Sequence, residues 1–190
     1  MLKFLKRSAK GVSAPHDKPT AVLDTVKMPV PEQVVIPMSM HIGAPAEPVV
    51  QKGDAVKVGT LIGKAGGFVS ANIYSSVSGT VKEVKPAFHM VNGAVCKAIV
   101  IVSDGEQTVD PDCVPPEVTD KKSLLAAIQA CGLVGVGGAG FPTHVKLAAD
   151  TIDTLIINGA ECEPYLSTDT REMLECSDTI ISGIEAVMKH

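Results

Sequence analysis

The stretch GVGGAGFPTHVK, Gly135–Lys146, decides how the rest of the chain is interpreted. Together with Gly132 it brings five glycines into the nine residues that end at Gly140. Pro142 follows, at a point where a helix can begin. A short apolar run then leads to a second motif, NGAECEPY, at 158–165. Because glycines let bare backbone approach a flat or phosphorylated ligand, the loop predicts a nucleotide-cofactor site.

Composition limits the classes of protein to which the chain can belong. With 190 residues it can hold one large domain or two small ones. Aromatic residues make up only 3%, so any core must rest on aliphatic side chains. The net charge of −4 argues against a nucleic-acid partner, and no apolar run is long enough for a transmembrane segment. The five cysteines include no CxxC pair, so we expect reduced thiols and no metal site in this chain.

The chain before the glycine-rich loop divides into three parts by composition. Residues 1–32, rich in Pro and Lys, predict an extended arm. Residues 33–104 carry short Val- and Ile-rich runs separated by turn signals, which predict a β domain. The clearest turns are Gly53-Asp54 and Ser78-Gly79. Residues 105–120 are acidic and rich in proline, which is typical of a linker.

Residues 121–190 alternate between helical and strand-like patterns, as in part of an α/β domain. Apolar spacing predicts a helix from Lys121 to Cys131 that Gly132 ends. A short helix from Pro142 and a buried strand at Thr154–Ile157 follow.

A long helix is expected to complete this part of the chain. Asp169 and Glu172 resemble a capping box at its start. The expected apolar stripe consists of Met173, Ile180, Ile184 and Val187. No C-cap signal precedes His190, so we expect the chain to be cut from a longer protein.

The glycine-rich loop admits two interpretations from its residues alone. Gly135, Gly137 and Gly140 satisfy G-x-G-x-x-G, which in a Rossmann dehydrogenase holds the NAD pyrophosphate after a strand. The two residues before Gly135 are a poor match to a strand, and Phe141 stands where a P-loop needs lysine. A packing turn is the alternative.

The β segment resembles the barrel-sandwich hybrid fold of biotinyl and lipoyl carrier domains. Carriers hold their cofactor on a lysine at a hairpin tip, within a motif that this chain lacks. Lys64, Lys82 and Lys85 have no such setting, which favours a scaffold or docking domain over a carrier. His41 has no neighbouring metal ligand in the sequence, so a packing role is expected.

Longer motifs shift the interpretation of the loop toward a flavin site. GVGGAGFPTHVK and INGAECEP resemble GRGGAGFPTGLK and NADEGEP of the flavin-binding subunit of respiratory complex I. The chain is more similar still to RnfC, a component of the Rnf ion-translocating electron-transport complex. That resemblance includes APHDKPT, IPMSMHIGAPAEPVVQKGD, GGFVSANIYSSVSGTV and NGAECEPYLSTDTREM, and it spans nearly the whole chain. It implies two domains of α+β class, a barrel-sandwich hybrid followed by part of a Rossmann-like, complex-I flavoprotein-type α/β domain.

The resemblance also implies the residues that would contact FMN. The isoalloxazine and ribityl groups would lie against Gly135, Gly137 and Gly138, where a Cβ would collide. Lys146 would neutralise or hydrogen-bond the flavin. Asn158 and Glu161 would contact the ribityl group or the ring edge.

The resemblance extends to contacts with NADH. Phe141 and Glu163 would help to form the NADH pocket. Val136 and Ala160 replace an arginine and an aspartate of complex I, and both changes fit the Rnf pattern. Ala149 stands where complex I has a second aromatic. Flavin binding is therefore better supported than the detailed NADH contacts.

The activity that the resemblance implies is electron transfer between NADH and membrane partners. FMN would exchange a hydride with NADH, and 4Fe-4S clusters, expected only beyond His190, would pass single electrons to other subunits. The location would be peripheral, on the cytoplasmic side of a bacterial cell membrane, and the electron transfer would be coupled to ion translocation. For residues 1–190 alone we expect poor flavin affinity and no activity. A Rossmann NAD dehydrogenase and a non-catalytic carrier or docking module remain the alternatives.

Overall fold

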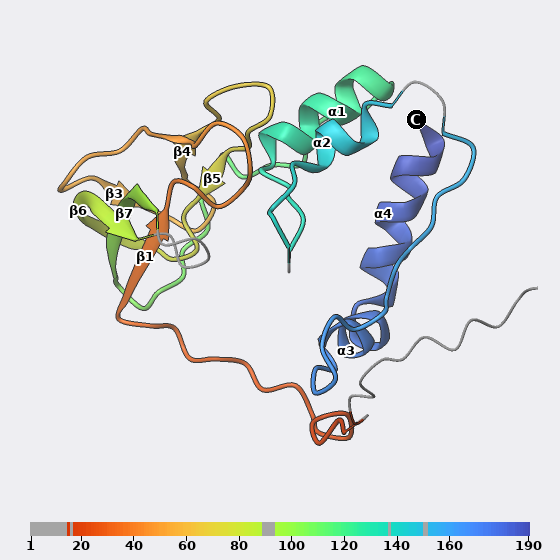
Figure 1. The fold of residues 1–190 in the computed structure, drawn as a ribbon. Helices are drawn as coiled ribbons and strands as arrows, with labels where there is room; N and C mark the ends of the chain where they lie inside the picture. Colours follow the sequence, from red (N-terminus) through yellow and green to blue (C-terminus); the bar gives the residue numbers. More distant parts are fainter. Residues whose placement is uncertain (1–14, 16, 89–93, 137, 150–151) are drawn as a thin grey trace, which may run out of the picture. The chain divides into compact units, whose positions relative to one another are not determined.

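A computed structural model describes residue 15 and residues 17–88, 94–136, 138–149 and 152–190 (Figure 1). The chain forms two compact units. One consists of Met1–Val26 with Ile156–Glu185, and the other of Lys27–Leu155 with Ala186–His190. Each unit is described by itself below.

The second unit holds two antiparallel sheets built from the predicted β segment. The first has the order β1-β7-β6-β3 and the second the order β2-β4-β5. The strands of the first are β1 (Gln33–Pro37), β7 (Val95–Ser103), β6 (Gly79–Phe88) and β3 (Ala55–Val56). The strands of the second are β2 (Glu47–Pro48), β4 (Leu61–Lys64) and β5 (Ile73–Tyr74).

The two sheets share one aliphatic core. Ile62 of β4, Val81 of β6 and Ile99 and Ile101 of β7 are fully buried. Burying each such side chain stabilises the fold by roughly 1.5–3 kcal/mol. Strand β7 lies between β1 and β6, and its central residues 98–101 are all buried. The Val- and Ile-rich pattern therefore predicted the β segment correctly.

The turn predicted at Gly53-Asp54 is confirmed, whereas the one predicted at Ser78-Gly79 is not, because Gly79 lies in a strand. Gly53 has a φ of +97°, and its amide donates to the carbonyl of Val81 at 2.8 Å. Gly79 begins β6 in direct contact with the backbone of β7, because a Cβ there would overlap the carbonyl oxygen of Val102.

The predicted helices around the glycine-rich loop also form. Helix α1 covers Lys121–Ala130, and a reciprocal capping box of Asp120 and Ser123 closes its start. Gly132, with a φ of +71°, ends it as expected. Helix α2 covers Thr143–Leu147 after Pro142.

The predicted strand at Thr154–Ile157 is wrong. These residues form no strand and are exposed, with Ile156 82% accessible. A strand needs a partner to take its backbone hydrogen bonds, and none pairs with this run within the described part of the chain. Apolar composition predicted burial here, but it could not supply the neighbouring strand. The Rossmann-like expectation for residues 121–190 stays a prediction.

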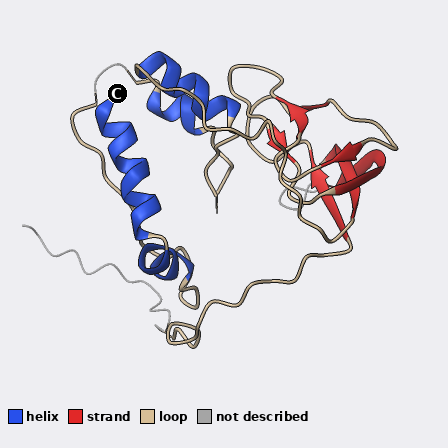
Figure 2. Cartoon of the chain, turned by 180° about the vertical axis from the view of Figure 1, so that it is seen from behind, coloured by secondary structure: helices blue, strands red, loops and turns tan. Residues whose placement is uncertain are grey.

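The long C-terminal helix is divided in two. Helix α3 covers Thr168–Glu175 and helix α4 covers Ser177–Lys189, and both are drawn as blue helices in Figure 2. Cys176 lies between them in the sequence. Ser167, and not Asp169, occupies the N-cap position. No residue of either helix is fully buried, but Ile180, Ile184 and Val187 of the predicted apolar stripe are half-buried. Met173, its first residue, lies against Gly159. Within those same ranges, no helix has the length and hydropathy required to span a membrane.

Candidate functional site

The glycine-rich loop is a hairpin closed at its base. The amide of Gly135 donates to the carbonyl of Phe141 at 2.9 Å, and the amide of Thr143 donates to Leu133 at 3.0 Å. Val134 and Pro142 form an isolated bridge between these bonds. The loop connects α1 to α2 (Figure 1). The loop is thus closed at its base although no strand precedes it.

Two glycines fix the ends of this loop to the β domain. Gly140 has a φ of +64°, and a Cβ there would lie 2.5 Å from the carbonyl oxygen of Met40 and 2.8 Å from Cα of His41. A Cβ on Gly132 would overlap the carbonyl oxygen of Asn72. These glycines therefore serve packing, because only bare backbone can approach so closely.

The tip glycines have a different environment. A Cβ on Gly138 would have no heavy atom within 4 Å, and one on Gly135 would come no closer than 3.7 Å to its neighbours. Val136 between them is 99% exposed. Gly137 lies outside the described residues. Nothing in the described fold requires glycine at 135 or 138, so their bare backbone is free to face a ligand.

Phe141 and Lys146, the other predicted residues of this stretch, lie close together. The Nζ of Lys146 is 6.0 Å from the centroid of the Phe141 ring, at the outer limit of a cation–π contact. Lys146 is exposed and Phe141 is half-buried. The loop thus presents bare backbone, an aromatic face and one cation, which suit a planar anionic ligand.

Side chains of the β domain hold the end of α1 beside this loop. The amide of Asn72 donates to the carbonyl of Ala130 at 3.2 Å, and the Tyr74 hydroxyl donates to the same oxygen. Gln129 reaches the carbonyl of Gly67 at 3.4 Å. The orphan carbonyl at the helix end is therefore satisfied by the β domain.

His41 is buried under the loop and has the expected packing role. Its Nδ1 donates to the carbonyl of Ile42 at 2.9 Å, and its Nε2 accepts the amide of Ala71 at 3.2 Å. This assignment of the tautomer satisfies both ring nitrogens. His41 fixes the backbone that Gly140 touches.

The residues of the second motif belong to the other unit. Asn158 accepts the amide of Ala160 at 3.0 Å in a local turn. Glu163 is exposed, and its backbone carbonyl accepts the amide of Leu166. Asn158 and Glu163 are therefore described in a different unit from the loop at Gly135–Lys146.

Glu161 has a structural role that the sequence pattern did not reveal. Its carboxylate accepts the amide of Thr170 at 3.0 Å and that of Asp169 at 3.3 Å, which caps the start of α3. The hydrogen bond from the Thr170 amide, opposed by some desolvation, holds the pKa of Glu161 below its usual range. Because the cap comes from a residue well before the helix, the Ser/Thr-x-x-Glu pattern could not find it.

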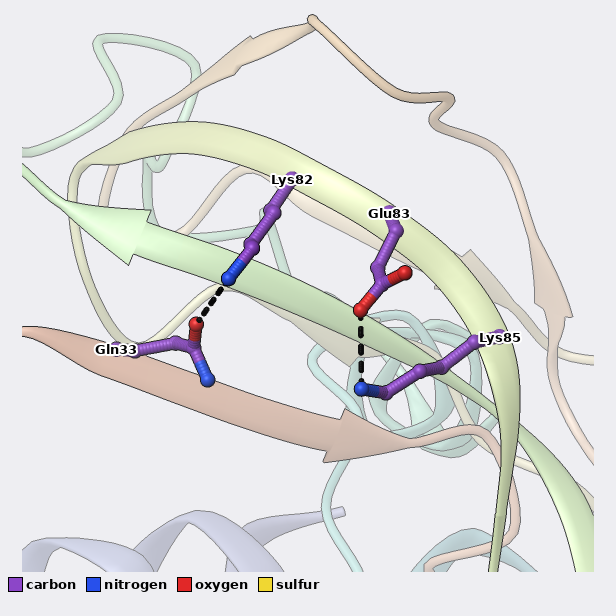
Figure 3. Close-up of polar contacts among 4 residues, drawn as sticks. All are labelled: Gln33, Lys82, Glu83 and Lys85. Atoms are coloured by element: carbon purple, nitrogen blue, oxygen red, sulfur yellow. Dashed lines mark hydrogen bonds and ion pairs between the residues drawn. The ribbon is translucent and has the colours of Figure 1, made fainter.

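Lys64, Lys82 and Lys85, the lysines weighed as carrier sites, all lie in strands. Lys82 in β6 reaches across β7 to the amide oxygen of Gln33 at 3.3 Å (Figure 3). Lys85 pairs with Glu83 at 2.9 Å, and this contact lowers the pKa of that carboxyl group. Lys64 is the last residue of β4. None of the three lies at a hairpin tip as a carrier lysine would.

Two family models together cover most of the chain. The RnfC barrel sandwich hybrid domain matches residues 6–106, and the Nuo51 FMN-binding domain matches residues 128–190. The chain is thus similar to a barrel-sandwich hybrid domain in its first part and to an FMN-binding domain of the Nuo51 type in its last part. The chain belongs to the RnfC family.

Curated relatives from several bacteria are similar to most of this chain. The RnfC-type component of a proton-translocating ferredoxin:NAD(+) oxidoreductase complex from Clostridium ljungdahlii is 47% identical over 96% of this chain. The corresponding component of the Na(+)-translocating complex from Acetobacterium woodii is 44% identical over 84% of it. That of an ion-translocating oxidoreductase complex from Rhodobacter capsulatus is 42% identical over 89%. The chain spans 42%, 37% and 34% of these relatives' lengths.

Proposed function

We propose that this chain forms the first wall of an FMN site in an Rnf-type electron-transfer protein. The tip of the loop carries the argument, because Gly135 and Gly138 are exposed and have no packing role. A planar ring can lie against such backbone, whereas a side chain would hold it away. The match of residues 128–190 to an FMN-binding domain supports the same ligand.

Each remaining site residue has a role in this proposal. Lys146 supplies the positive charge beside the flavin, and Phe141 offers an aromatic face to NADH. Asn158 and Glu161 contribute from the second motif, and Glu161 would do so through the one lone pair on Oε2 that its three hydrogen bonds leave free. Glu163, whose carboxylate is exposed, lines the NADH pocket.

Bound FMN would accept a hydride and release electrons singly, which links NADH to one-electron carriers. The protein's own part is to orient the ring and to exclude water from one of its faces. The partners proposed are NADH and other subunits of a membrane complex that couples electron transfer to ion translocation. Further proposals are 4Fe-4S clusters in the remainder of the full-length protein, and a peripheral position on the cytoplasmic side of the membrane. The relatives' names, which describe ferredoxin:NAD(+) oxidoreductase complexes, support this assignment.

The Rossmann dehydrogenase alternative lacks the strand that it requires before Gly135. Helix α1 ends at Ala130, and Val134 forms only an isolated bridge. The third glycine of the fingerprint, Gly140, packs against the backbone of the β domain, so it does not face a ligand. The pyrophosphate-binding geometry of that fold is therefore not supported here.

An FMN titration of the protein at its natural length tests the proposal. We expect quenching of flavin fluorescence on binding, and about tenfold or more weaker binding for Gly138→Val, whose side chain would occupy the flavin wall. Gly183→Val, in α4 with open space around it and no positive φ, is the control for an added side chain elsewhere. Unchanged affinity of Gly138→Val would refute the placement of the flavin, and NAD binding without FMN would favour the dehydrogenase.

A further inference from the structure

His144 is a buried polar residue that the proposed site does not yet use. It lies in α2, two positions before Lys146, and is only 3% exposed. Its Nε2 donates to the backbone carbonyl of Phe68 in the β domain at 2.8 Å. Its ring meets the ring of Phe68 edge to face, with centroids 5.7 Å apart. His144 thus joins α2 to the β domain by both polar and aromatic contact.

Helix α2 needs such an external contact to hold its position. It has five residues, and Pro142 at its start makes no side-chain capping bond. A helix this short is unstable by itself, so its geometry is set by what it packs against. The only hydrogen-bonded side chain of α2 among the described contacts is that of His144. Helix α2 also packs against α1, so the bond from His144 to Phe68 is what ties α2, and with it Lys146, directly to the β domain.

The histidine holds this position with one polar atom unsatisfied. With the proton on Nε2, Nδ1 must act as an acceptor, and it is buried without a partner in the described structure. The contact is therefore not optimised for stability alone, because an unsatisfied buried nitrogen costs free energy. An aliphatic side chain of similar size would avoid that cost but would leave the Phe68 carbonyl without its donor.

We propose that His144 is a positioning residue of the flavin site, which fixes α2 and the closed glycine-rich loop to the β domain. This inference rests on the proposed FMN function. Contact of Gly140 with Met40 holds one end of the loop, and the bond from His144 to Phe68 holds the helix that follows. The barrel-sandwich domain then serves as a fixed support for the glycine-rich loop, and not as a mobile domain that carries a covalently bound cofactor.

The test compares two replacements of His144 in the protein at its natural length. His144→Leu keeps an aliphatic bulk but has no donor for Phe68. His144→Gln places an amide donor the same number of bonds from the backbone as Nε2. Without the bond to Phe68, a smaller fraction of molecules holds the loop in the conformation that binds FMN. The apparent Kd for FMN rises by the factor by which that fraction falls. We expect about tenfold weaker binding for Leu and within about threefold of wild type for Gln.

A core variant separates positioning from general loss of stability. Ile99→Val removes a methyl group from the β core, far in sequence from α2, and should leave FMN affinity unchanged. Hydrogen exchange of the Gly135 and Thr143 amides, which close the loop, should accelerate in His144→Leu and not in Ile99→Val. If Leu binds FMN as tightly as wild type, or if a folded Gln variant binds as weakly as Leu, the proposal is overturned and the FMN site stands. If the wild-type protein itself binds no FMN, the proposed function is wrong, and the inference about His144, which rests on it, is wrong as well.

Discussion

Replacement of Gly140 by alanine should be the most damaging single-methyl change in the glycine-rich loop. The new Cβ would lie 2.5 Å from the Met40 carbonyl oxygen and 2.8 Å from Cα of His41, both of them backbone atoms. Neither atom can rotate away as a side chain would, and the backbone under the loop is fixed by the hydrogen bonds of His41. The β domain and the loop must therefore separate or distort.

The expected change in the free energy of unfolding combines two destabilising contributions and one stabilising contribution. A φ of +64° costs an L-residue roughly 1–2 kcal/mol. Overpacking against fixed atoms costs about 1–3 kcal/mol more. The lower entropy of the unfolded alanine chain returns about 0.4–1 kcal/mol. We expect Gly140→Ala to lower the free energy of unfolding by about 2–4 kcal/mol.

Urea unfolding followed by far-UV circular dichroism measures this change, since the chain has no tryptophan. Gly53→Ala isolates the φ term, because Gly53 has a φ of +97° and open space around it. Gly138→Ala controls for the substitution itself and should stay within about 0.5 kcal/mol of wild type. The reasoning is refuted if Gly140→Ala is no less stable than Gly53→Ala and the Gly135 amide exchanges at the wild-type rate.

Three further changes test other parts of the structure. Ile99→Ala should destabilise the β core by about 2–5 kcal/mol, measured by the same urea titration, because Ile99 is fully buried; a smaller loss would mean that the sheets collapse around the cavity. Tyr74→Phe should cost about 0.5–1.5 kcal/mol by removing one of two donors to Ala130, and a neutral result would show that Asn72 suffices. The folded state holds the pKa of Glu161 below its unfolded value, so its contribution is complete above the unfolded pKa and is lost as the pH falls through the folded pKa. Helix content followed by circular dichroism should therefore fall on acidification in wild type and change less in Glu161→Gln; parallel curves would show that the cap does not stabilise α3.

The β domain was predictable because its strands leave a local signal. Val- and Ile-rich runs such as those of β7, separated by turn residues, point to strands wherever they occur. Strands β2 and β5 were not predicted as separate elements, because two residues are too few to show an alternating pattern. Their positions follow from pairing with β4 instead, which is a tertiary property.

The failures of prediction in the second half have a common physical origin. The apolar run at Thr154–Ile157 indicates that burial is favourable, but the sequence of the run does not contain the surface that would cover it. Likewise the cap of α3 comes from Glu161 and the anchor of α2 from Phe68. In each case the residue or surface that determines the local structure lies outside the segment itself. Patterns within the segment therefore cannot predict it.

The glycines of the loop show how one motif can serve two purposes. In sequence all five are alike, and the fingerprint selects Gly135, Gly137 and Gly140 as one set. The environments divide them differently, since Gly132 and Gly140 touch the β domain while Gly135 and Gly138 are open. Substitutions at the first pair should therefore reduce stability, with loss of flavin as a consequence. Substitutions at the second pair should reduce flavin affinity in a protein that remains folded, and that separation distinguishes a flavin wall from a packing turn.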